Sequence, residues 1–452
     1  MTGVQTCALP ISSLPSWSPN GKWLLFESER TGKKNIYKIE APDGVKEGEQ
    51  ISFFAELEVD IQKERMKIFE ESWNSINKYF YDPKFHGIDW AKIKDKYQKV
   101  AENAQTDLEL NGVIQRMLGE LKASHLGISG PDKKNRVSTG YLGCSFSEVP
   151  DFNVLKVEEV LKGGPADKAW IRKGDYVFQI HETITKKDVN IDNLLVNTVG
   201  KIVKIYVSPS LNPGEGRYVD LIPVDSSAIE ELEYRQWLIK CVQTVKELCQ
   251  GRVIYIHLKD MDAQNLRNFR ELVLKAIPRI EGMILDVRNN GGGNIHQELI
   301  DILTRKPYIA YKGREEKVQY QPAIFWNRPV VVLINEKSFS DAEVFPYTFK
   351  ILKRGYLVGM PTSGGVIGTK DITLSNQATF RIPQVGYYTL EGQNMEGAGV
   401  VPDFVVPETP KDRAEGKDPQ LIKAIEIIMQ QIAPKKVETK PMQSQEEKAE
   451  EK

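Results

Sequence analysis

Three short apolar runs in the second half of the chain constrain its fold more than any other feature. They span residues 252–257, 282–286 and 329–334, and none shows the alternation of a half-exposed strand. Runs of this length and character are typical of strands that are buried on both faces of a sheet. Because helical patterns lie between and after them, we expect an α/β domain with a mixed sheet over residues 211–432.

The rest of the chain predicts a multidomain protein of the α+β and α/β classes. Its 452 residues are enough for about two to four domains. Residues 56–136 have a helical pattern, and residues 137–210 change to short strands and turns. Residues 12–55 contain the turn and strand signals of a hairpin, which resembles one blade of a β-propeller. The apolar positions that predict the first helix, at three- and four-residue steps, are Met66, Phe69, Trp73, Ile76 and Phe80.

Both ends of the chain differ from these segments. Residues 1–11 resemble the in-frame translation of a sequencing-library adapter, so we expect them not to be native and an export signal, if one exists, to be missing. Residues 433–452 are rich in Lys and Glu and have almost no large apolar side chain, which predicts a disordered tail.

Composition excludes several classes of function. Lys and Arg number 61 against 62 Asp and Glu, so the chain lacks the positive surplus that nucleic acid or an anionic membrane would attract. No apolar run approaches the roughly 20 residues that span a bilayer. The four cysteines have neither C-x-x-C spacing nor His partners at metal spacing. We therefore expect no nucleic-acid partner, no membrane partner, no metal and no other cofactor.

A serine follows the third apolar run at the point where a helix is predicted to begin. Ser340 has Glu343 three residues later, which is a capping-box pattern, so one interpretation is that Ser340 only caps the helix. The functional interpretation places its hydroxyl at a strand-to-helix turn, near free N–H groups and the positive end of the helix dipole. Such a position suits a nucleophile that generates an oxyanion.

Three glycines follow the second apolar run. Gly291, Gly292 and Gly293 could form a flexible turn, or they could let a substrate carbonyl approach backbone N–H groups as an oxyanion hole requires. They do not form a phosphate-binding loop, because neither a following Gly-Lys-Ser/Thr nor a G-x-G-x-x-G spacing is present.

Five histidines are available as general base. His125, directly after Ser124, is the candidate. The others fit structural, exposed, helix-start or local hydrogen-bonding roles, and they are His86, His181, His257 and His296. Glu396 stands among small residues in a loop and by itself reads as a solvated charge.

Together these segments resemble the tricorn protease family. The D-x-R-x-N-G-G-G, N-x-x-x-x-S-D and E-x-x-G-V-x-P-D motifs occur in the family order over roughly residues 56–407. The resemblance implies a serine peptidase in which Ser340 is the nucleophile, His125 the base, and Ser124 and Glu396 its supports. It also implies an oxyanion hole from the amide of Asp341 and one amide of Gly291, Gly292 or Gly293.

The same resemblance implies partners and a compartment. Its substrates would be peptides or unfolded proteins, its assembly a homo-oligomer (a hexamer in the family), and its compartment the cytoplasm. Residues 137–210 resemble a PDZ domain, with a Leu-Gly loop at 142–143, a G-x-P-A helix start at 163–166 and a K-G-D strand entry at 173–175, although Trp170 stands where glycine is usual. This PDZ-like segment would bind peptide carboxylates through the amides of Tyr141, Leu142 and Gly143. An acidic residue that selects basic side chains has no clear counterpart, although Glu315 and Glu316 are candidates.

Three alternatives stay open. Relatives of the carboxy-terminal processing type use a Ser-Lys pair, but Gly365 stands at the lysine position and Lys370 is displaced from it. A catalytically silent relative would bind peptides or other ligands without cutting them. A PDZ-centred adaptor would act without Ser340.

Overall fold

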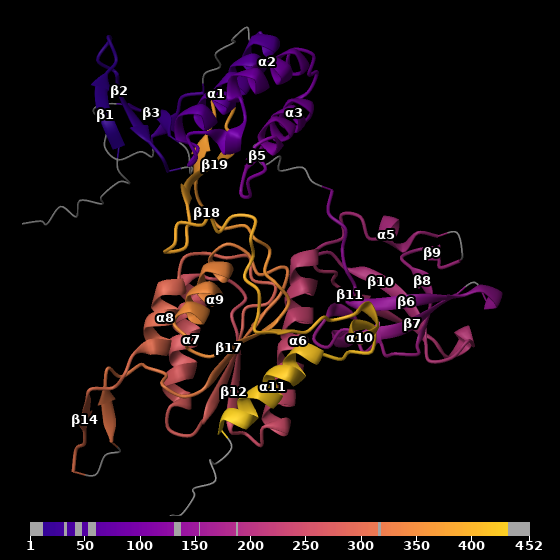
Figure 1. Ribbon diagram of the computed structural model, residues 1–452. Coiled ribbons are helices and arrows are strands. Elements are labelled where there is room, and N and C mark those ends of the chain that lie inside the picture. Colours follow the sequence, from indigo (N-terminus) through magenta and orange to yellow (C-terminus); the bar gives the residue numbers. More distant parts are fainter. Residues whose placement is uncertain are drawn as a thin grey trace, which may run out of the picture. The chain divides into compact units, whose positions relative to one another are not determined.

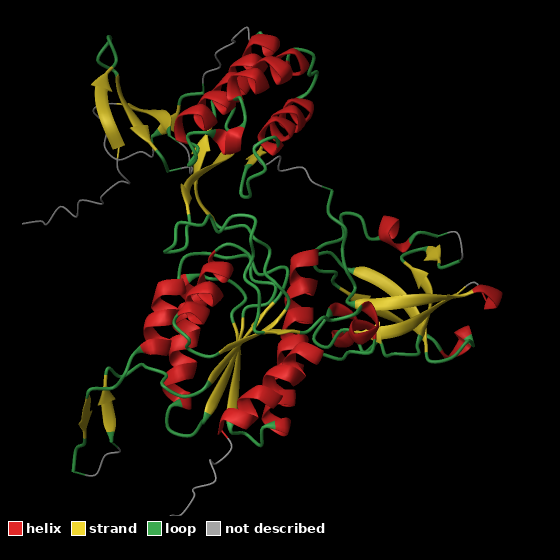
Figure 2. Cartoon of the chain, in the orientation of Figure 1, coloured by secondary structure: helices red, strands yellow, loops and turns green. Residues whose placement is uncertain are grey.

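A computed structural model of the chain describes residues 12–30, 34–40, 48–52, 60–130, 137–152, 154–186, 189–314 and 318–432. The expected non-native segment 1–11 and the expected tail 433–452 lie outside these residues, as do Glu315 and Glu316. Helices and several sheets alternate along the chain, which confirms a mixed α/β architecture (Figures 1 and 2). The chain forms two compact units, Met1–Glu64 and Arg65–Lys452.

The first unit contains an antiparallel sheet in the strand order β1-β2-β3-β4. Its strands are β1 (Ser12–Trp17), β2 (Trp23–Ser28), β3 (Asn35–Glu40) and β4 (Glu49–Gln50). The rings of Phe26 and Tyr37 are buried and stack with centroids 5.8 Å apart. The hairpin expected here is thus present as β2 and β3, while its origin in a propeller blade stays a prediction.

The helical part of the second unit is closed by strands from much later in the chain. Its helices are α1 (Ile61–Tyr79), α2 (Trp90–Ala101) and α3 (Asp107–Gly119), with the 3-10 turn η1 (Phe85–Gly87) between the first two. The side chains of Asp89 and Thr106 accept N–H hydrogen bonds at the starts of α2 and α3. A three-stranded sheet, β18 (Ile367–Thr373), β19 (Thr379–Gly386) and β5 (Gly127–Ser129), contributes Phe380 and Ile382 to the same core.

Residues 144–221 form a six-stranded antiparallel sheet with the path β11-β10-β8-β7-β6. The strands are β6 (Cys144–Val149), β7 (Val154–Val160), β8 (Tyr176–Ile180), β9 (Thr183–Ile184), β10 (Val203–Ser208) and β11 (Arg217–Leu221). Four short helices accompany them: η2 (Pro150–Phe152), α4 (Pro165–Lys168), α5 (Ile191–Leu194) and η3 (Pro213–Glu215). Trp170, which stands where the expected PDZ-like pattern has glycine, has φ +61° and is 70% exposed, and this left-handed conformation is one that favours glycine.

The expected end of this segment near residue 210 is too early. β11 pairs with β10 from Val203↔Leu221 to Val207↔Arg217, so the sheet continues to Leu221. The Pro and Gly of Asn212-Pro-Gly214 mark a turn between two paired strands and not a domain boundary, because turn residues serve both purposes in a sequence.

The expected α/β layer is present, but the mixed sheet expected in it is wrong. Its five-stranded sheet, in the order β12-β13-β16-β17-β20, is entirely parallel, because crossovers, most of them helical, connect its strands. The strands are β12 (Val253–His257), β13 (Gly282–Asp286), β16 (Val330–Ile334), β17 (Tyr356–Gly359) and β20 (Phe404–Val405), and every adjacent pair is parallel. All five residues of β13 and all five of β16 are buried, as their uninterrupted apolar runs predict.

Helices cover both faces of this sheet (Figure 2). One core contains side chains of α7 (Ala263–Ala276), α8 (His296–Thr304) and α9 (Asp341–Ile351). The other contains side chains of α6 (Ser226–Leu248) and α11 (Pro419–Ile432), with α10 (Pro410–Ala414) ahead of α11. A separate hairpin, β14 (Ile309–Tyr311) and β15 (Gln319–Gln321), has exposed residues throughout. None of the helices in the described ranges has the length and apolar character needed to cross a bilayer.

Candidate active site

The glycine loop and the serine loop lie next to each other because they follow adjacent parallel strands. β13 and β16 pair from Met283↔Val330 to Asp286↔Leu333, so their carboxyl ends meet at one edge of the sheet. Hydrogen bonds join the two loops: Ser338 Oγ donates to Val287 O over 2.8 Å, and Phe339 N donates to Asn290 O over 3.0 Å. Ser340 is thereby held beside the three glycines.

Ser340 has a backbone conformation that is unusual for a residue with a side chain. Its φ is +59° and its ψ is −121°, whereas an ordinary N-cap residue has extended angles. Conformations of this kind cost about 1–3 kcal/mol and persist where the surroundings fix them. Ser340 N donates to Gly365 O over 3.1 Å and to Glu343 Oε1 over 3.2 Å. The strained turn therefore resembles the strand-to-helix elbow that exposes a nucleophile more than a simple helix cap.

Close packing explains why Gly292 and Gly293 are glycines. A Cβ at Gly292, where φ is +100°, would lie 2.6 Å from Cβ of Ser340. A Cβ at Gly293, where φ is +151°, would lie 2.0 Å from the carbonyl oxygen of Met261. Only a residue without a side chain brings the loop this close to Ser340.

Some backbone N–H groups near Ser340 already donate a hydrogen bond within the chain, and others do not. Gly292 N donates to Asn290 Oδ1 over 2.8 Å, so this N–H is already used in a hydrogen bond within the chain. Within the described chain, the N–H groups of Asp341, Gly291 and Gly293 donate to no hydrogen bond. The Asp341 amide is the first of α9, where unsatisfied N–H groups and the helix dipole favour negative charge.

Ser124, His125 and Glu396 form one hydrogen-bonded group, although 272 residues separate the first from the last. Ser124 donates its backbone N–H to Glu396 Oε1 over 2.7 Å and its hydroxyl to Glu396 Oε2 over 3.1 Å. Because the hydroxyl proton points to the carboxylate, Ser124 Oγ accepts from His125 Nδ1–H over 2.7 Å. This tautomer leaves a lone pair on His125 Nε2.

The surroundings of His125 favour its neutral form. Burial lowers the pKa of His125, the positive charge of Arg381 acts in the same direction, and the negative charge of Glu396 opposes both. The ring of Phe339, the residue before Ser340, stacks on the imidazole with centroids 4.4 Å apart and planes 20° apart. Among the described residues, no hydrogen bond joins Ser340 Oγ to His125, a separation that is common before substrate binds.

Glu396 is held from two further sides. Val366 N donates to Glu396 Oε2 over 2.8 Å, and Glu396 N donates to Asn394 Oδ1 over 3.0 Å. Asn394 Nδ2 donates to the hydroxyl of Tyr81 over 3.2 Å, and that hydroxyl is 2.7 Å from His86 Nε2. The expected solvated charge is therefore part of an ordered network.

The sequence pattern indicated only that Glu343 could take part in a capping box. It did not indicate the hydrogen bonds that Glu343 makes to a distant loop. Its carboxylate is fully buried and accepts from Thr362 Oγ1 and Gly364 N over 2.6 Å, and from Gly365 N over 2.8 Å. It accepts from Ser340 N as well, so it joins the turn at Ser340 to the loop at residues 362–365. Four donors offset the cost of burying this charge.

The remaining histidines have other positions. His257 is nearly buried on β12, where it contacts Tyr234 Oη over 2.9 Å and Arg288 O over 3.0 Å, and burial lowers its pKa. His296 begins α8 and pairs through Nδ1 with the side chain of Asp341, which raises the pKa of His296. His181 is exposed in the turn between β8 and β9.

One expected ligand contact of the PDZ-like segment is corrected by the structure. Tyr141 N donates to Val224 O over 2.8 Å, and Val224 N donates back to Tyr141 O over 3.1 Å. The Tyr141 amide is thus used by the chain itself, since this short antiparallel bridge fixes the loop. Leu142 and Gly143 stay candidates for binding a carboxylate.

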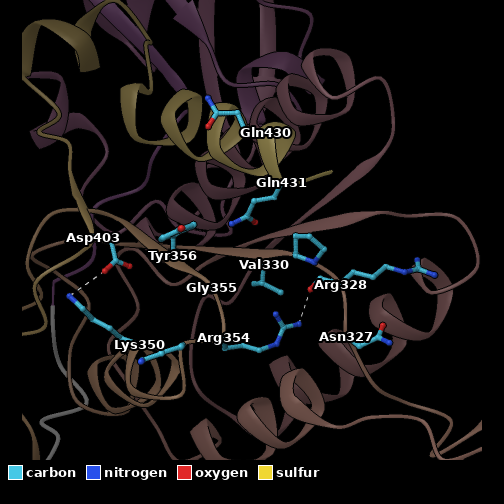
Figure 3. Close-up of a pocket in the computed structure, with 12 residues that line it drawn as sticks. Asn327, Arg328, Val330, Lys350, Arg354, Gly355, Tyr356, Asp403, Gln430 and Gln431 are labelled. Atoms are coloured by element: carbon cyan, nitrogen blue, oxygen red, sulfur yellow. Dashed lines mark hydrogen bonds and ion pairs between the residues drawn. The ribbon is translucent and has the colours of Figure 1, made fainter. Parts of the chain in front are cut away.

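A hollow of about 760 Å³ lies at the other end of the central sheet (Figure 3). Val330 and Tyr356, the first residues of β16 and β17, line it, whereas the site above follows the last residues of these strands. Its charged lining residues are Arg328, Lys350, Lys353, Arg354 and Asp403, of which Lys350 and Asp403 pair over 3.5 Å. In the part of the chain that the structure describes, no cluster of three His, Cys, Asp or Glu side chains could hold a metal ion.

Two family models match the chain where these elements lie. The model described as Peptidase family S41 matches residues 252–406, and the Tricorn protease C1 domain matches residues 61–119. Over these residues the chain is similar to serine-type peptidases of family S41 and to the tricorn proteases.

Three similar proteins illustrate this relationship. A Tricorn-like protease C-terminal subunit of Sulfurisphaera tokodaii is 30% identical over 395 residues, which cover 83% of this chain and 44% of the relative. The tricorn protease of Thermoplasma volcanium is 27% identical over 442 residues, covering 93% and 41%. A crystal structure of the tricorn protease matches with a TM-score of 0.75 at 24% identity, covering 93% of this chain and 41% of that one. The chain thus spans less than half the length of these relatives.

Proposed function

We propose that the chain is a serine endopeptidase that hydrolyses peptide bonds of oligopeptides or unfolded proteins. The observation that carries this proposal is the group of Ser124, His125 and Glu396, which orients a neutral imidazole with a free Nε2 lone pair. The strained turn at Ser340 supplies the nucleophile, and the neighbouring unpaired Asp341 amide supplies an N–H group for the oxyanion.

In the proposed reaction, Ser340 Oγ attacks the carbonyl carbon of the scissile peptide while His125 Nε2 takes the hydroxyl proton. The carbonyl oxygen becomes an oxyanion, which accepts from the Asp341 amide and from the amide of Gly291 or Gly293. His125 then gives its proton to the leaving amine, and an acyl group remains on Ser340. Water, deprotonated by His125, releases the acyl group and restores the serine.

Ser124 and Glu396 act through His125 in this scheme. The Nδ1–H hydrogen bond to Ser124 fixes the tautomer, and the charge of Glu396 stabilises the imidazolium that forms during each proton transfer. A Ser-Lys mechanism has less support, since Gly365 occupies the expected lysine position and the Lys370 side chain is exposed on β18.

The other assignments belong to the same proposal. Residues 137–221 act as a PDZ-like domain that binds peptide carboxylates at the Leu142 and Gly143 amides, residues 12–55 derive from a propeller, and the chain forms a homo-oligomer. Titration with free and amidated forms of one peptide tests the carboxylate site. Equal affinities for the two forms would exclude it.

Fluorophosphonate labelling with mapping of the adduct tests the catalytic proposal. We expect one adduct, on Ser340, and loss of both labelling and peptide cleavage in Ser340→Ala. The matched control is Ser363→Ala, because Ser363 is a nearby exposed serine whose role is only a backbone hydrogen bond to Ser338. Cleavage that survives in Ser340→Ala would refute the proposal. A wild-type chain that binds peptides without labelling would support the silent relative or the PDZ-centred adaptor.

A further inference from the structure

The stacked pair of His125 and Phe339 holds the imidazole in a way that its hydrogen bond alone does not. The bond from Nδ1 to Ser124 Oγ fixes one point of the ring, but it leaves the ring plane able to turn about the Nδ1···Oγ direction. Phe339 lies nearly parallel to the imidazole, 20° from coplanar, with centroids 4.4 Å apart. A flat neighbour at this distance restricts rotation of the imidazole plane and so fixes the direction in which Nε2 points.

Phe339 itself is anchored by the loops that form the site. Its backbone N–H donates to Asn290 O over 3.0 Å, and its carbonyl accepts from Ala342 N over 3.1 Å. The ring is only partly buried, and Phe339 belongs to none of the buried cores of the described chain. Core filling therefore does not account for an aromatic side chain at this position.

The ring also uses the space that a side chain at position 365 would need. A Cβ on Gly365 would lie 2.1 Å from Phe339 Cε2 and 2.8 Å from Cζ, below any contact that real Cβ atoms make. Gly365 cannot move away easily, because its N–H donates to Glu343 Oε1 and its carbonyl accepts from Ser340 N. The phenyl ring and a lysine at position 365 are thus mutually exclusive without a shift of this loop.

We propose that Phe339 is the positioning residue that sets the plane of the His125 imidazole, and that Gly365 is glycine in order to admit the Phe339 ring. The inference rests on the proposed function for the role of His125 as base. It adds a specific reason why His125, and not a lysine, would be the base. The Phe339 ring occupies the space that a lysine side chain at position 365 would need, and the same ring orients His125.

Kinetics of two substitutions test the role of the ring. Phe339→Leu keeps an apolar side chain but removes the flat face, so kcat/KM for a peptide substrate is expected to fall about tenfold to hundredfold, mostly in kcat. Phe339→Tyr keeps the ring and is expected to recover most of this loss. Phe178→Leu, which changes a partly buried aromatic residue on β8, is the matched control. Equal losses in the Leu and Tyr variants would overturn the proposal.

The titration of His125 gives a readout that does not depend on turnover. The charged groups that act on His125 are Glu396 and Arg381, and neither is changed in these variants. Phe339→Leu uncovers the imidazole, so NMR should show the pKa of His125 rising towards its ordinary value, and the acid limb of kcat/KM should move to higher pH with it. An unchanged titration in a folded Leu variant contradicts the proposal even if activity falls.

A double-mutant cycle tests the pairing of Phe339 with Gly365. Gly365→Ala alone is expected to lower Tm, because the new Cβ meets the ring, and Phe339→Ala should remove most of that loss when the two are combined. Additive changes in Tm would show that the two positions are independent. A wild-type chain that fails to label at Ser340 would refute the proposed function, whereas the NMR titration and this cycle would still decide the inference.

Discussion

At the residue scale, one carboxylate orders the proposed base, His125. Glu396 accepts two hydrogen bonds from Ser124 and one from Val366 N, and its charge opposes the lowering of the His125 pKa by burial. In the proposed reaction such a group would orient the imidazole and stabilise its charged form, and so would contribute in the transition state more than in substrate binding.

Glu396→Gln removes the negative charge of this side chain but keeps its size. We expect kcat/KM to fall about 10–100-fold, since the imidazolium loses its stabilising charge while an amide of equal size remains. Because Glu396 raises the pKa of His125, its removal should move the acid limb of the pH profile to lower pH. Glu391→Gln, at an exposed position in the same loop, is the control for the loss of one negative charge. An acid limb that stays in place would contradict the assigned coupling.

At the element scale, α8 and α9 are joined at their first residues. The Asp341 carboxylate accepts from Ile295 N over 2.7 Å and from His296 N over 3.1 Å, and it pairs with the His296 ring. The same residue offers its own amide to the proposed oxyanion hole. The first residue of α9 is therefore bonded to the start of α8. This contact also fixes the end of the glycine loop, because that loop leads directly into α8.

His296 makes this contact dependent on pH in a defined direction, and His296→Asn removes that dependence. The folded-state pKa of His296 is raised, so the stabilisation by its charged form is fully present below the unfolded-state pKa and is lost as pH rises through the folded value. We expect a destabilisation of about 1–2 kcal/mol at acidic pH that shrinks as the pH rises past neutrality. Urea unfolding over about pH 5.5–9, which spans the titration of histidine, measures it, with His181→Asn as an exposed control. A difference that grows with pH would refute the pairing.

At the scale of the whole molecule, the proposed site belongs to the second unit alone. Ser124, His125, Ser340 and Glu396 all lie within Arg65–Lys452, whereas the first unit closes its own four-stranded sheet. The start of α1 requires Asp60, whose carboxylate accepts from Lys63 N over 3.1 Å.

A chain that begins at Asp60 is therefore expected to fold and to label at Ser340 at a rate within about threefold of the full chain, less than 1 kcal/mol in barrier height. Labelling kinetics and thermal unfolding of the two chains provide the comparison. A chain that begins at Lys78 would lose Ile68, Phe69 and Ile76 from the helical core and should not fold. Loss of labelling in the first truncation would show that the site depends on residues before Asp60.

Features that depend on neighbours along the chain could be predicted from the sequence by itself. The apolar runs of β12, β13 and β16, the helix that starts after Ser340, and the close approach allowed by three glycines all follow from local pattern. The turn at Asn212-Pro-Gly214 shows the limit of such patterns, since the same residues mark a hairpin or a domain boundary.

Only the tertiary structure decided which distant side chains meet. It placed Glu396 on Ser124 and Phe339 on His125 and against Gly365. It also placed the Glu343 carboxylate against the loop at residues 362–365, and it paired the Tyr141 amide with Val224. These contacts depend on where parallel strands end and on how β18 and β19 close the helical core, and no local periodicity encodes either. Thus the sequence by itself determined the candidate residues, and the tertiary structure decided which of them are in contact.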